Sequence, residues 1–294
     1  MKEIQIKSIL NKHKKRDDWF LDDYSVNPYS GCSFNCIYCY IRGSKYGENM
    51  AETLSVKINA PEILEKQLKR RAAKGEYGII LIASSTEAYL PAEEKYQITR
   101  RMLEIILKYR FPVHIVTKSP LVVRDLDILQ QIDRQAVLLE DLKDKLDRGV
   151  IISFSFSSLN KKYINLFEPG APSPAERFEA LRHCSKKGFL TGANLIPLLP
   201  FLSDTEEEME KMIAEAKNHG ARFILAGALT LFGKGPADSK TLYYKILNNH
   251  FPHLVKSCKN LFRIFPYPPK EYQNKLEETA KSLCEKYHLH YRII

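Results

Sequence analysis

The sequence predicts an α/β fold, a partial (β/α)6 parallel barrel with a mostly helical C-terminal cap. Short apolar runs alternate with amphipathic helical stretches along most of the chain, which is the pattern of βαβ units. About six such units can be counted, fewer than the eight of a full barrel. The alternation stops near Gly233. We therefore expect an N-terminal extension (1–23), a partial barrel (24–232) and a cap packed on the barrel (233–294).

Each predicted strand is a short buried run, and each predicted helix has apolar residues at helical spacing. The strands are predicted at 24–29, 78–83, 113–117, 150–156, 192–199 and 221–230. The helices are predicted at 93–109, 125–146, 175–187, 204–219, 239–250 and 270–288. Ser203 and Glu206 have the spacing of a capping box, which predicts that the fourth helix begins at Asp204.

Composition places the chain among soluble globular proteins, with 44% hydrophobic and 27% charged residues. It contains no apolar run long enough to span a membrane, and its first twenty residues lack the apolar core of a signal peptide. We therefore expect a cytoplasmic protein with no membrane partner. In that setting the six cysteines indicate reduced thiols or metal ligands in preference to disulfides.

The net charge is +10, from 45 basic and 35 acidic residues. An excess of this size favours a polyanionic partner such as nucleic acid. The basic residues are dispersed, however, and the two local clusters at 12–16 and 69–74 can equally be solvated faces. Nucleic acid is thus a possible partner on charge alone.

Cys32, Cys36 and Cys39 form a C-x3-C-x2-C triplet directly after the first predicted strand. Active sites of parallel α/β sheets gather at the carboxyl ends of the strands. Three closely spaced thiolates suit an iron–sulfur cluster and leave one iron open for catalysis. Two alternatives stay open, namely ordinary buried cysteines and a zinc site with a distant fourth ligand. The other cysteines are far apart in sequence and are expected to be small buried residues: Cys184, Cys258 and Cys284.

The triplet, with an aromatic residue before its last cysteine, resembles the signature of the radical S-adenosylmethionine superfamily. Further segments follow in the order NPY at 27–29, ASSTE at 83–87, VTKS at 116–119, SFS at 153–155 and FEPGAPSP at 167–174. In this order they resemble the spore photoproduct lyase-like family over roughly residues 24–230. The resemblance implies a 4Fe–4S cluster whose open iron binds S-adenosylmethionine. It also implies an electron donor such as ferredoxin or flavodoxin.

The resemblance further implies a set of cofactor contacts at the strand ends. They are Tyr38 against the adenine, Ser84, Ser85, Thr86 and Glu87 around the methionine amine, Lys118 on the methionine carboxylate, and Ser155 near the methionine or ribose. Lysine is a compact cation suited to a carboxylate, and hydroxyls reach polar edges without filling a site. The simpler alternatives are a surface lysine, serines that cap helices, and a Glu168 that organises its own loop through Arg177.

One position departs from the DNA-repair lyase of that family. There a cysteine after the second strand donates hydrogen to the product radical, and the matching position here is Ser85. An O–H bond is much stronger than an S–H bond, so a serine cannot replace that cysteine. Residues 133–148 also resemble an insertion. We therefore expect a radical enzyme that abstracts hydrogen from an unidentified substrate, a nucleic acid base first and a peptide or small metabolite next. The competing class is a noncatalytic zinc or iron–sulfur module.

Overall fold

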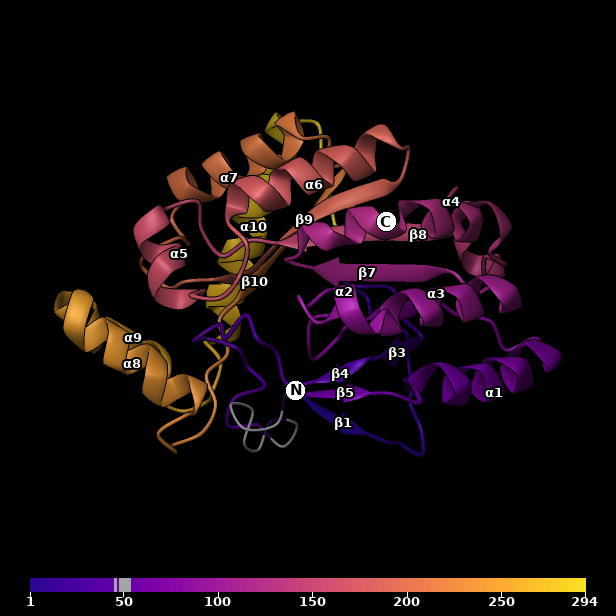
Figure 1. The fold of residues 1–294 in the computed structure, drawn as a ribbon. Helices are drawn as coiled ribbons and strands as arrows, with labels where there is room; N and C mark the ends of the chain where they lie inside the picture. The colour runs from indigo at the N-terminus through magenta and orange to yellow at the C-terminus, as the bar shows by residue number, and fades with distance from the viewer. Residues whose placement is uncertain (45–46, 48–53) are drawn as a thin grey trace.

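A computed structural model describes residues 1–44, 47 and 54–294. An eight-stranded sheet forms its centre, with the strand order β11-β10-β9-β8-β7-β6-β3-β2 (Figure 1). The six predicted strands are adjacent and parallel in it: β3 (Tyr24–Val26), β6 (Ile80–Ile82), β7 (Val113–Thr117), β8 (Val150–Ser155), β9 (Leu190–Leu198) and β10 (Phe223–Ala228). In the described part of the chain β2 and β11 are edge strands that do not pair with each other. The prediction of a partial parallel barrel is therefore confirmed.

Residues from both ends of the chain complete the sheet. The N-terminal β2 (Asn11–Lys12) pairs antiparallel with β3, and the C-terminal β11 (His290–Tyr291) pairs parallel with β10. A separate small sheet has the order β1-β5-β4, formed by β1 (Lys2–Ile4), β5 (Ser55–Lys57) and β4 (Tyr29–Ser30). The predicted division at residues 23 and 232 stays a prediction.

Helices cover the outer face of the sheet because each crossover between parallel strands must pack its apolar side on it. These helices are α1 (Ala60–Ala73), α3 (Ile98–Tyr109), α4 (Leu126–Gln135), α6 (Pro174–Lys186), α7 (Glu206–Asn218) and α10 (Lys270–Lys286). The cap helices α8 (Ser239–His250) and α9 (Val255–Leu261) lie at the opposite end of the molecule from α1 (Figure 1). Within the described ranges, no helix is both long enough and apolar enough to cross a bilayer.

The helix predicted over 125–146 is shorter, because α4 ends at Gln135. Ala136 is extended, and the Asp133 carboxylate accepts a hydrogen bond from the Val150 backbone N–H at 2.9 Å, which turns the chain back toward β8. The rest of the predicted helix is a loop with one short 3-10 turn, η2 (Glu140–Leu142). The apolar spacing that predicted the helix, at Leu126, Ile128, Leu129 and Ile132, lies within α4. Leu142 and Leu146 are buried in a separate cluster with residues of β8, β9 and β10.

The predicted capping box before α7 is wrong. The helix begins at Glu206, and the Thr205 hydroxyl accepts from the Glu208 backbone N–H at 3.3 Å. The Ser203 hydroxyl instead accepts from the Leu199 N–H at 2.9 Å and closes the turn after β9. Two serine or threonine hydroxyls within three residues both satisfy the capping pattern, and the tertiary turn decides between them.

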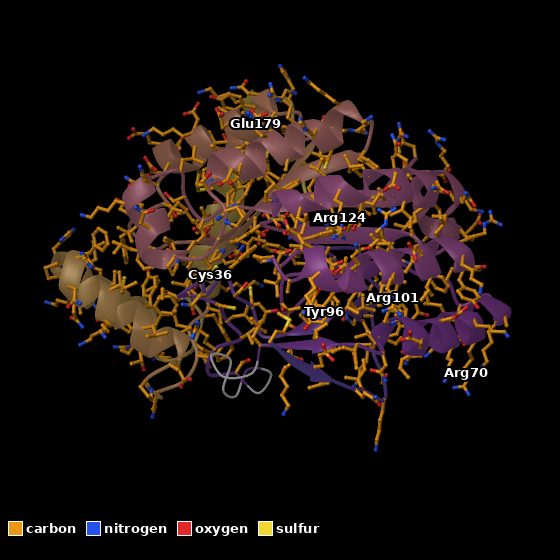
Figure 2. The ribbon with its side chains drawn as sticks, viewed as in Figure 1. Cys36, Arg70, Tyr96, Arg101, Arg124 and Glu179 are labelled. Carbon is orange, nitrogen blue, oxygen red and sulfur yellow. The ribbon has the colours of Figure 1, made fainter. Side chains whose placement is uncertain are left out.

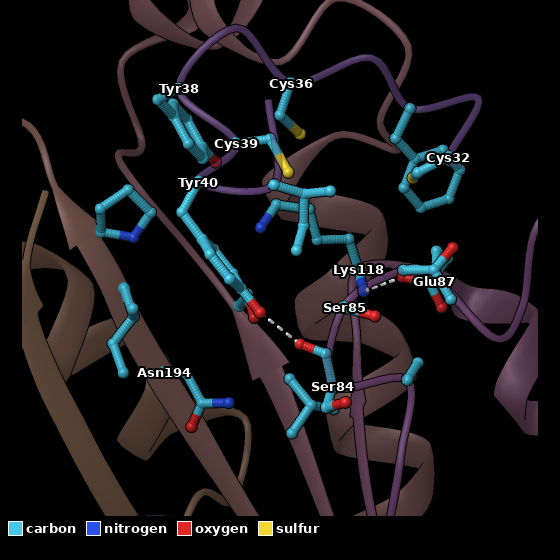
Figure 3. Close-up of a pocket in the computed structure, with 18 of the residues that line it drawn as sticks. Cys32, Cys36, Tyr38, Cys39, Tyr40, Ser84, Ser85, Glu87, Lys118 and Asn194 are labelled. Atoms are coloured by element: carbon cyan, nitrogen blue, oxygen red, sulfur yellow. Dashed lines mark hydrogen bonds between the residues drawn. The ribbon is translucent and has the colours of Figure 1, made fainter. Parts of the chain in front are cut away.

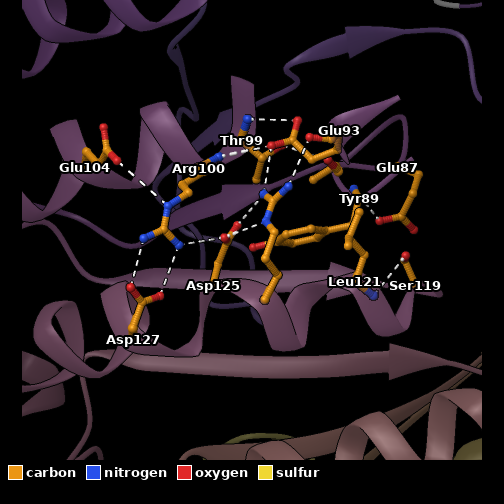
Figure 4. A network of polar contacts seen from close by, with 12 residues as sticks. Glu87, Tyr89, Glu93, Thr99, Arg100, Glu104, Ser119, Leu121, Asp125 and Asp127 are labelled. Atoms are coloured by element: carbon orange, nitrogen blue, oxygen red, sulfur yellow. Dashed lines mark hydrogen bonds and ion pairs between the residues drawn. The ribbon is translucent and has the colours of Figure 1, made fainter. Parts of the chain in front are cut away.

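The helix predicted over 93–109 is interrupted at Gln97, whose φ of 49° ends α2 (Glu93–Tyr96) before α3. The interruption lets the buried Glu93 carboxylate accept two backbone N–H bonds at the start of α3. Arg124 contacts both Glu93 and Asp125 at 2.8–3.0 Å, and Arg100 bridges Asp125 to the exposed end of α4 (Figure 4). This network holds α2 and α3 against the loop that follows β7.

Candidate active site

A cavity of about 380 Å³ opens at the carboxyl ends of the parallel strands (Figure 3). Its volume lies in the range typical of small-molecule sites. Among its lining residues are all ten predicted site residues: Cys32, Cys36, Tyr38, Cys39, Ser84, Ser85, Thr86, Glu87, Lys118 and Ser155. The structure therefore brings the whole predicted set together, while the role of each residue stays a prediction.

The three cysteines belong to a tightly turned loop that follows β4 and that the structure describes as far as Ser44. Gly31 and Asn35 adopt left-handed backbone conformations, with φ of 77° and 55°. The buried Arg42 donates to the Asn35 side chain and, at 3.2 Å, to the Cys36 carbonyl. The loop thus has internal hydrogen bonds that hold the three thiols on one side without a metal.

The thiols themselves are in a desolvated setting. Burial raises the pKa of Cys32 to about 12 and raises the pKa of Cys36 and Cys39 as well. All three would therefore lose a proton on binding a metal. Three cysteine thiolates are the ligands that an iron–sulfur cluster takes when each binds a different iron.

Glu168 is a buried carboxylate that organises one side of the cavity. It accepts from the Tyr38 hydroxyl and from the Ser157 hydroxyl, the latter at 2.7 Å, and forms a fully buried ion pair with Arg177. Burial would raise the pKa of Glu168, but the charges of Lys118 and Arg177 outweigh it and hold that pKa at about 2. The carboxylate is therefore charged and fixes the Tyr38 ring in place. One expectation from the sequence was that Glu168 organises its own loop through Arg177. The ion pair between these two residues does form.

Lys118 is held at the cavity wall and is not a free surface lysine. Its side chain is 13% exposed, and its Nζ lies 3.9 Å from Glu168 Oε1 and 5.9 Å from the centre of the Tyr38 ring. Glu168 forms its closer ion pair with Arg177, so the Lys118 ammonium can also bind an anionic group in the cavity. Its position fits the recognition of a carboxylate.

The turn after β6 presents Ser84 and Ser85 to the cavity. Ala83 has a φ of 70°, and the Asn27 side chain holds the turn by donating to Ser84 Oγ at 3.1 Å and accepting from the Ser85 N–H at 2.9 Å. The Thr86 hydroxyl donates to the Gly31 carbonyl and so joins this turn to the cysteine loop. In the sequence, Asn27 belongs to the NPY motif but has no evident role. Its hydrogen-bond partners, Ser84 and Ser85, lie more than fifty residues away.

Glu87 joins two neighbouring strand ends. Its carboxylate accepts from the Thr117 hydroxyl at 2.6 Å, from the Lys118 N–H at 2.9 Å and from the Tyr89 N–H at 3.0 Å. Burial raises its pKa. These bonds make Glu87 a positioning residue for Lys118, and its predicted contact with a cofactor amine stays a prediction.

Asn194 on β9 is a cavity residue that sequence reasoning missed. It lies beside Ser155 in the sheet register, and its amide nitrogen donates to the Ser153 hydroxyl at 2.8 Å. Its Oδ1 is buried and has no hydrogen-bond partner in the described structure (Figure 3). A buried oxygen of this kind is costly unless a ligand donates to it. Only the register of β8 and β9 reveals the residue, and the sequence does not give that register.

The model of the radical SAM superfamily matches residues 26–216. The chain belongs to the radical SAM superfamily. It is 25% identical over 272 residues to an uncharacterized protein of Mycobacterium bovis, covering 90% of this chain and 75% of that one. It is 22% identical over 249 residues to the radical SAM Nalpha-GlyT isomerase of Pseudomonas phage M6, covering 83% of this chain and 46% of the isomerase.

Among solved structures, this radical SAM enzyme resembles a spore photoproduct lyase mutant with bound AdoMet and dinucleoside spore photoproduct. The TM-score is 0.64 with 18% sequence identity, over 93% of this chain and 76% of the other. The likeness confirms the expected spore photoproduct lyase-like fold. Membership of the superfamily implies S-adenosylmethionine and an iron–sulfur cluster as cofactors.

Tyr40 is a partly exposed residue that lines the radical SAM cavity. Its ring is 44% exposed, and its hydroxyl donates to the Ser84 carbonyl at 2.6 Å (Figure 3). The cysteine loop and the β6 turn therefore meet across the opening. In the sequence, its place next to Cys39 is the only signal for it.

Proposed function

We propose that this enzyme reductively cleaves S-adenosylmethionine at a 4Fe–4S cluster held by Cys32, Cys36 and Cys39. The observation that carries the proposal is that three loop thiols and one walled-in lysine, Lys118, face the same cavity. When bound, the reduced cluster and S-adenosylmethionine supply a 5′-deoxyadenosyl radical that abstracts hydrogen from the substrate. The electron comes from a donor such as ferredoxin or flavodoxin.

The side chains of the cavity would bind and orient the cofactor. Lys118 offers its ammonium to the methionine carboxylate, and the Ser84–Thr86 turn faces the methionine amine. The Tyr38 ring, fixed through its hydroxyl, offers a flat surface to the adenine. Ser155 and the unpartnered Asn194 Oδ1 suit the ribose hydroxyls, since an amide oxygen accepts what a hydroxyl donates.

For the substrate we propose a nucleic acid base. The chain carries a net charge of +10, and the fold is similar to that of a lyase whose structure holds a dinucleoside. Ser85 at the position of the hydrogen-donor cysteine argues against repair of the spore photoproduct itself. A base modification that needs no thiol donor is consistent with this residue.

The cofactor chemistry is tested on protein reconstituted anaerobically with iron and sulfide. Dithionite-reduced wild type should convert S-adenosylmethionine to methionine and 5′-deoxyadenosine, and Cys36→Ala should not. Cys284→Ala, which alters a buried cysteine of α10 away from the cavity, is the matched control and should retain both iron and activity. A colourless wild type that binds one zinc after reconstitution would defeat the proposal.

The substrate class is tested by offering DNA, RNA and an unrelated peptide to the reduced enzyme. A nucleic acid substrate should increase 5′-deoxyadenosine formation, and enzymatic digestion should release a nucleoside of altered mass. An increase with the peptide alone would replace the nucleic acid in this proposal and leave the cofactor chemistry intact.

A further inference from the structure

The cap segment, residues 233–270, carries most of the chain's excess positive charge. It contains one acidic residue, Asp238, and seven basic residues: Lys234, Lys240, Lys245, Lys256, Lys259, Arg263 and Lys270. Six of the ten net charges of the chain therefore lie in this segment. None of the seven basic side chains forms an ion pair within the described residues, whereas Arg100 and Lys211 elsewhere each pair with two or more carboxylates. Their charge is therefore open to an external anion.

The same segment exposes large apolar side chains between α9 and α10. Phe265 is 54% exposed, Tyr267 51% and Ile264 72%. The Phe265 and Tyr267 rings are stacked with their centres 5.4 Å apart and 3° between their planes. Prolines at 266, 268 and 269 restrict the backbone around them. Two flat rings are thus presented to solvent on a stiff loop.

This loop lies beside the candidate active site. The Pro266 carbonyl accepts from the Leu231 N–H at 2.7 Å, directly after Thr230, which lines the cavity. At the other end of the segment, the Ala237 carbonyl accepts from the guanidinium of Arg42 in the cysteine loop at 3.3 Å. Cys36 lies between the sheet and the cap helices (Figure 2). A chain bound along the cap segment would therefore lead to the cavity mouth.

We propose that the cap segment binds single-stranded nucleic acid, with bases stacked on Phe265 and Tyr267 and phosphates on its unpaired basic side chains. The inference rests on the proposed function, in which a nucleic acid base is the substrate. Exposed aromatic rings within a basic surface are the usual means of holding unpaired bases, because every base has a flat face. An acidic protein would match the charge but gives no reason for two exposed stacked rings. A single strand would also present an unpaired base to the cavity without opening a duplex.

The binding test uses the full chain, reconstituted with iron and sulfide, and a fluorescein-labelled oligothymidylate of about 12 nucleotides, a length within the range that single-strand-binding folds cover. Anisotropy is measured over a series of salt concentrations. The double variant Phe265→Ala/Tyr267→Ala should weaken binding about tenfold or more, because each stacked base contributes about 1–3 kcal/mol. A duplex of the same sequence should bind more weakly than the single strand. An RNA oligomer in parallel shows which sugar is preferred.

The charge contribution is tested with two matched double reversals. Lys256→Glu/Lys259→Glu alters two exposed lysines of α9, and Lys66→Glu/Lys69→Glu makes the same change on α1, at the far end of the molecule (Figure 1). The first should weaken binding and flatten the salt dependence by about 0.7 in log–log slope for each phosphate that the variant no longer neutralises. The second should leave the slope unchanged.

Three outcomes would overturn the inference. The aromatic variant could bind as tightly as wild type, the α1 reversal could weaken binding as much as the α9 reversal, or polyglutamate could compete as well as the oligonucleotide. Formation of 5′-deoxyadenosine is measured on the same preparations. A wild type that forms it but binds no oligonucleotide would remove both this inference and the nucleic acid substrate, and would leave the cofactor chemistry standing. Binding that does not depend on the two rings would remove this inference alone.

Discussion

His114 Nε2 lies 2.8 Å from the Ser153 hydroxyl, and this contact sets the polarity of a hydrogen-bonded chain inside the barrel. His114 Nδ1 lies 2.9 Å from the Phe20 carbonyl, which can only accept, so Nδ1 carries the proton. Burial lowers the pKa of His114 to about 4, so the ring is neutral and Nε2 accepts from Ser153. Ser153 in turn accepts from the Asn194 amide nitrogen. This polarity fixes the Asn194 amide with its nitrogen on Ser153 and leaves its buried oxygen without a hydrogen-bond partner.

This polarity predicts that Asn194 contributes to cofactor affinity. Asn194→Ala should weaken binding of S-adenosylmethionine about fivefold, the effect of one net hydrogen bond of about 1 kcal/mol. Isothermal titration of the anaerobic, reconstituted enzyme measures it. Asn160→Ala removes the N-terminal cap of helix α5 (Lys161–Phe167), so it tests for a general effect of reduced stability and should leave the affinity unchanged. Equal affinities for wild type and Asn194→Ala would show that the oxygen does not face the cofactor.

The neutral His114 also predicts a pH dependence of stability. Its pKa is lowered from 6.5 to about 4 by burial, so the unfolded chain binds the proton more readily than the native protein. The neutral His114 ring therefore contributes fully to the free energy of unfolding above pH 6.5. This contribution is lost as the pH falls toward 4. Glu168, with its pKa lowered to about 2, loses its contribution only below its ordinary value of 4.5.

Urea unfolding at several pH values separates the two residues. Between pH 7.5 and pH 5, wild type should lose about 2 kcal/mol more than His114→Gln, from about 1.5 pH units at 1.36 kcal/mol each. Taking the difference between the two proteins cancels other groups that titrate in the same range. Parallel pH profiles would mean that His114 is not held neutral by burial.

The sheet could be predicted because its strands are short, almost entirely buried runs such as 113–117 and 150–156. Burial on both faces is a property of each segment, and parallel pairing requires it. The loop 136–149 could not be predicted, because the helical spacing of residues 126–132 does not show where the helix ends, and Leu142 and Leu146 are buried by tertiary contacts. The edge strands were also missed, since β2 and β11 are two residues long and form only against neighbours distant in sequence.

The residues of the candidate site also fall into two groups, those that the sequence predicts and those that only the folded structure reveals. The cysteine spacing and Lys118 follow from local motifs, and the structure places them on one cavity. Asn27, Asn194 and Tyr40 act through partners between 41 and 58 residues away, so their contacts depend on the folded sheet. Local sequence thus predicts the residues proposed to bind the cofactor, and the fold shows which residues position them.

The buried pair of Glu168 and Arg177 predicts a large difference between two arginine substitutions. Arg177→Met leaves a charged carboxylate in the interior and should lower the free energy of unfolding by about 3–5 kcal/mol. Arg182→Met, on the same helix, removes an exposed partner of Glu179 and should change it by less than about 1 kcal/mol. Urea unfolding of both variants measures the contrast. Similar losses would contradict the buried, charged state of Glu168.

Gly170 packs against the cysteine loop, so its substitution tests whether that packing shapes the cluster site. Its N–H donates to the Phe34 carbonyl at 3.0 Å, and a Cβ added there would lie 2.7 Å from the Ser33 carbonyl oxygen. Gly170→Ala must therefore displace the backbone between Cys32 and Cys36. We expect fewer iron atoms per chain after reconstitution and a loss of about 1–3 kcal/mol in unfolding free energy.

Gly75→Ala is the control for Gly170→Ala. Its φ of 66° strains any side chain, but no atom lies within 4 Å of the added Cβ. It should therefore lower stability by about 1 kcal/mol without changing the iron content. Iron and sulfide analysis beside urea unfolding separates the two effects. If both variants lost iron in proportion to stability, general destabilisation would explain the result, whereas iron loss confined to Gly170→Ala identifies the 168–171 turn as the support that holds the three thiols in position.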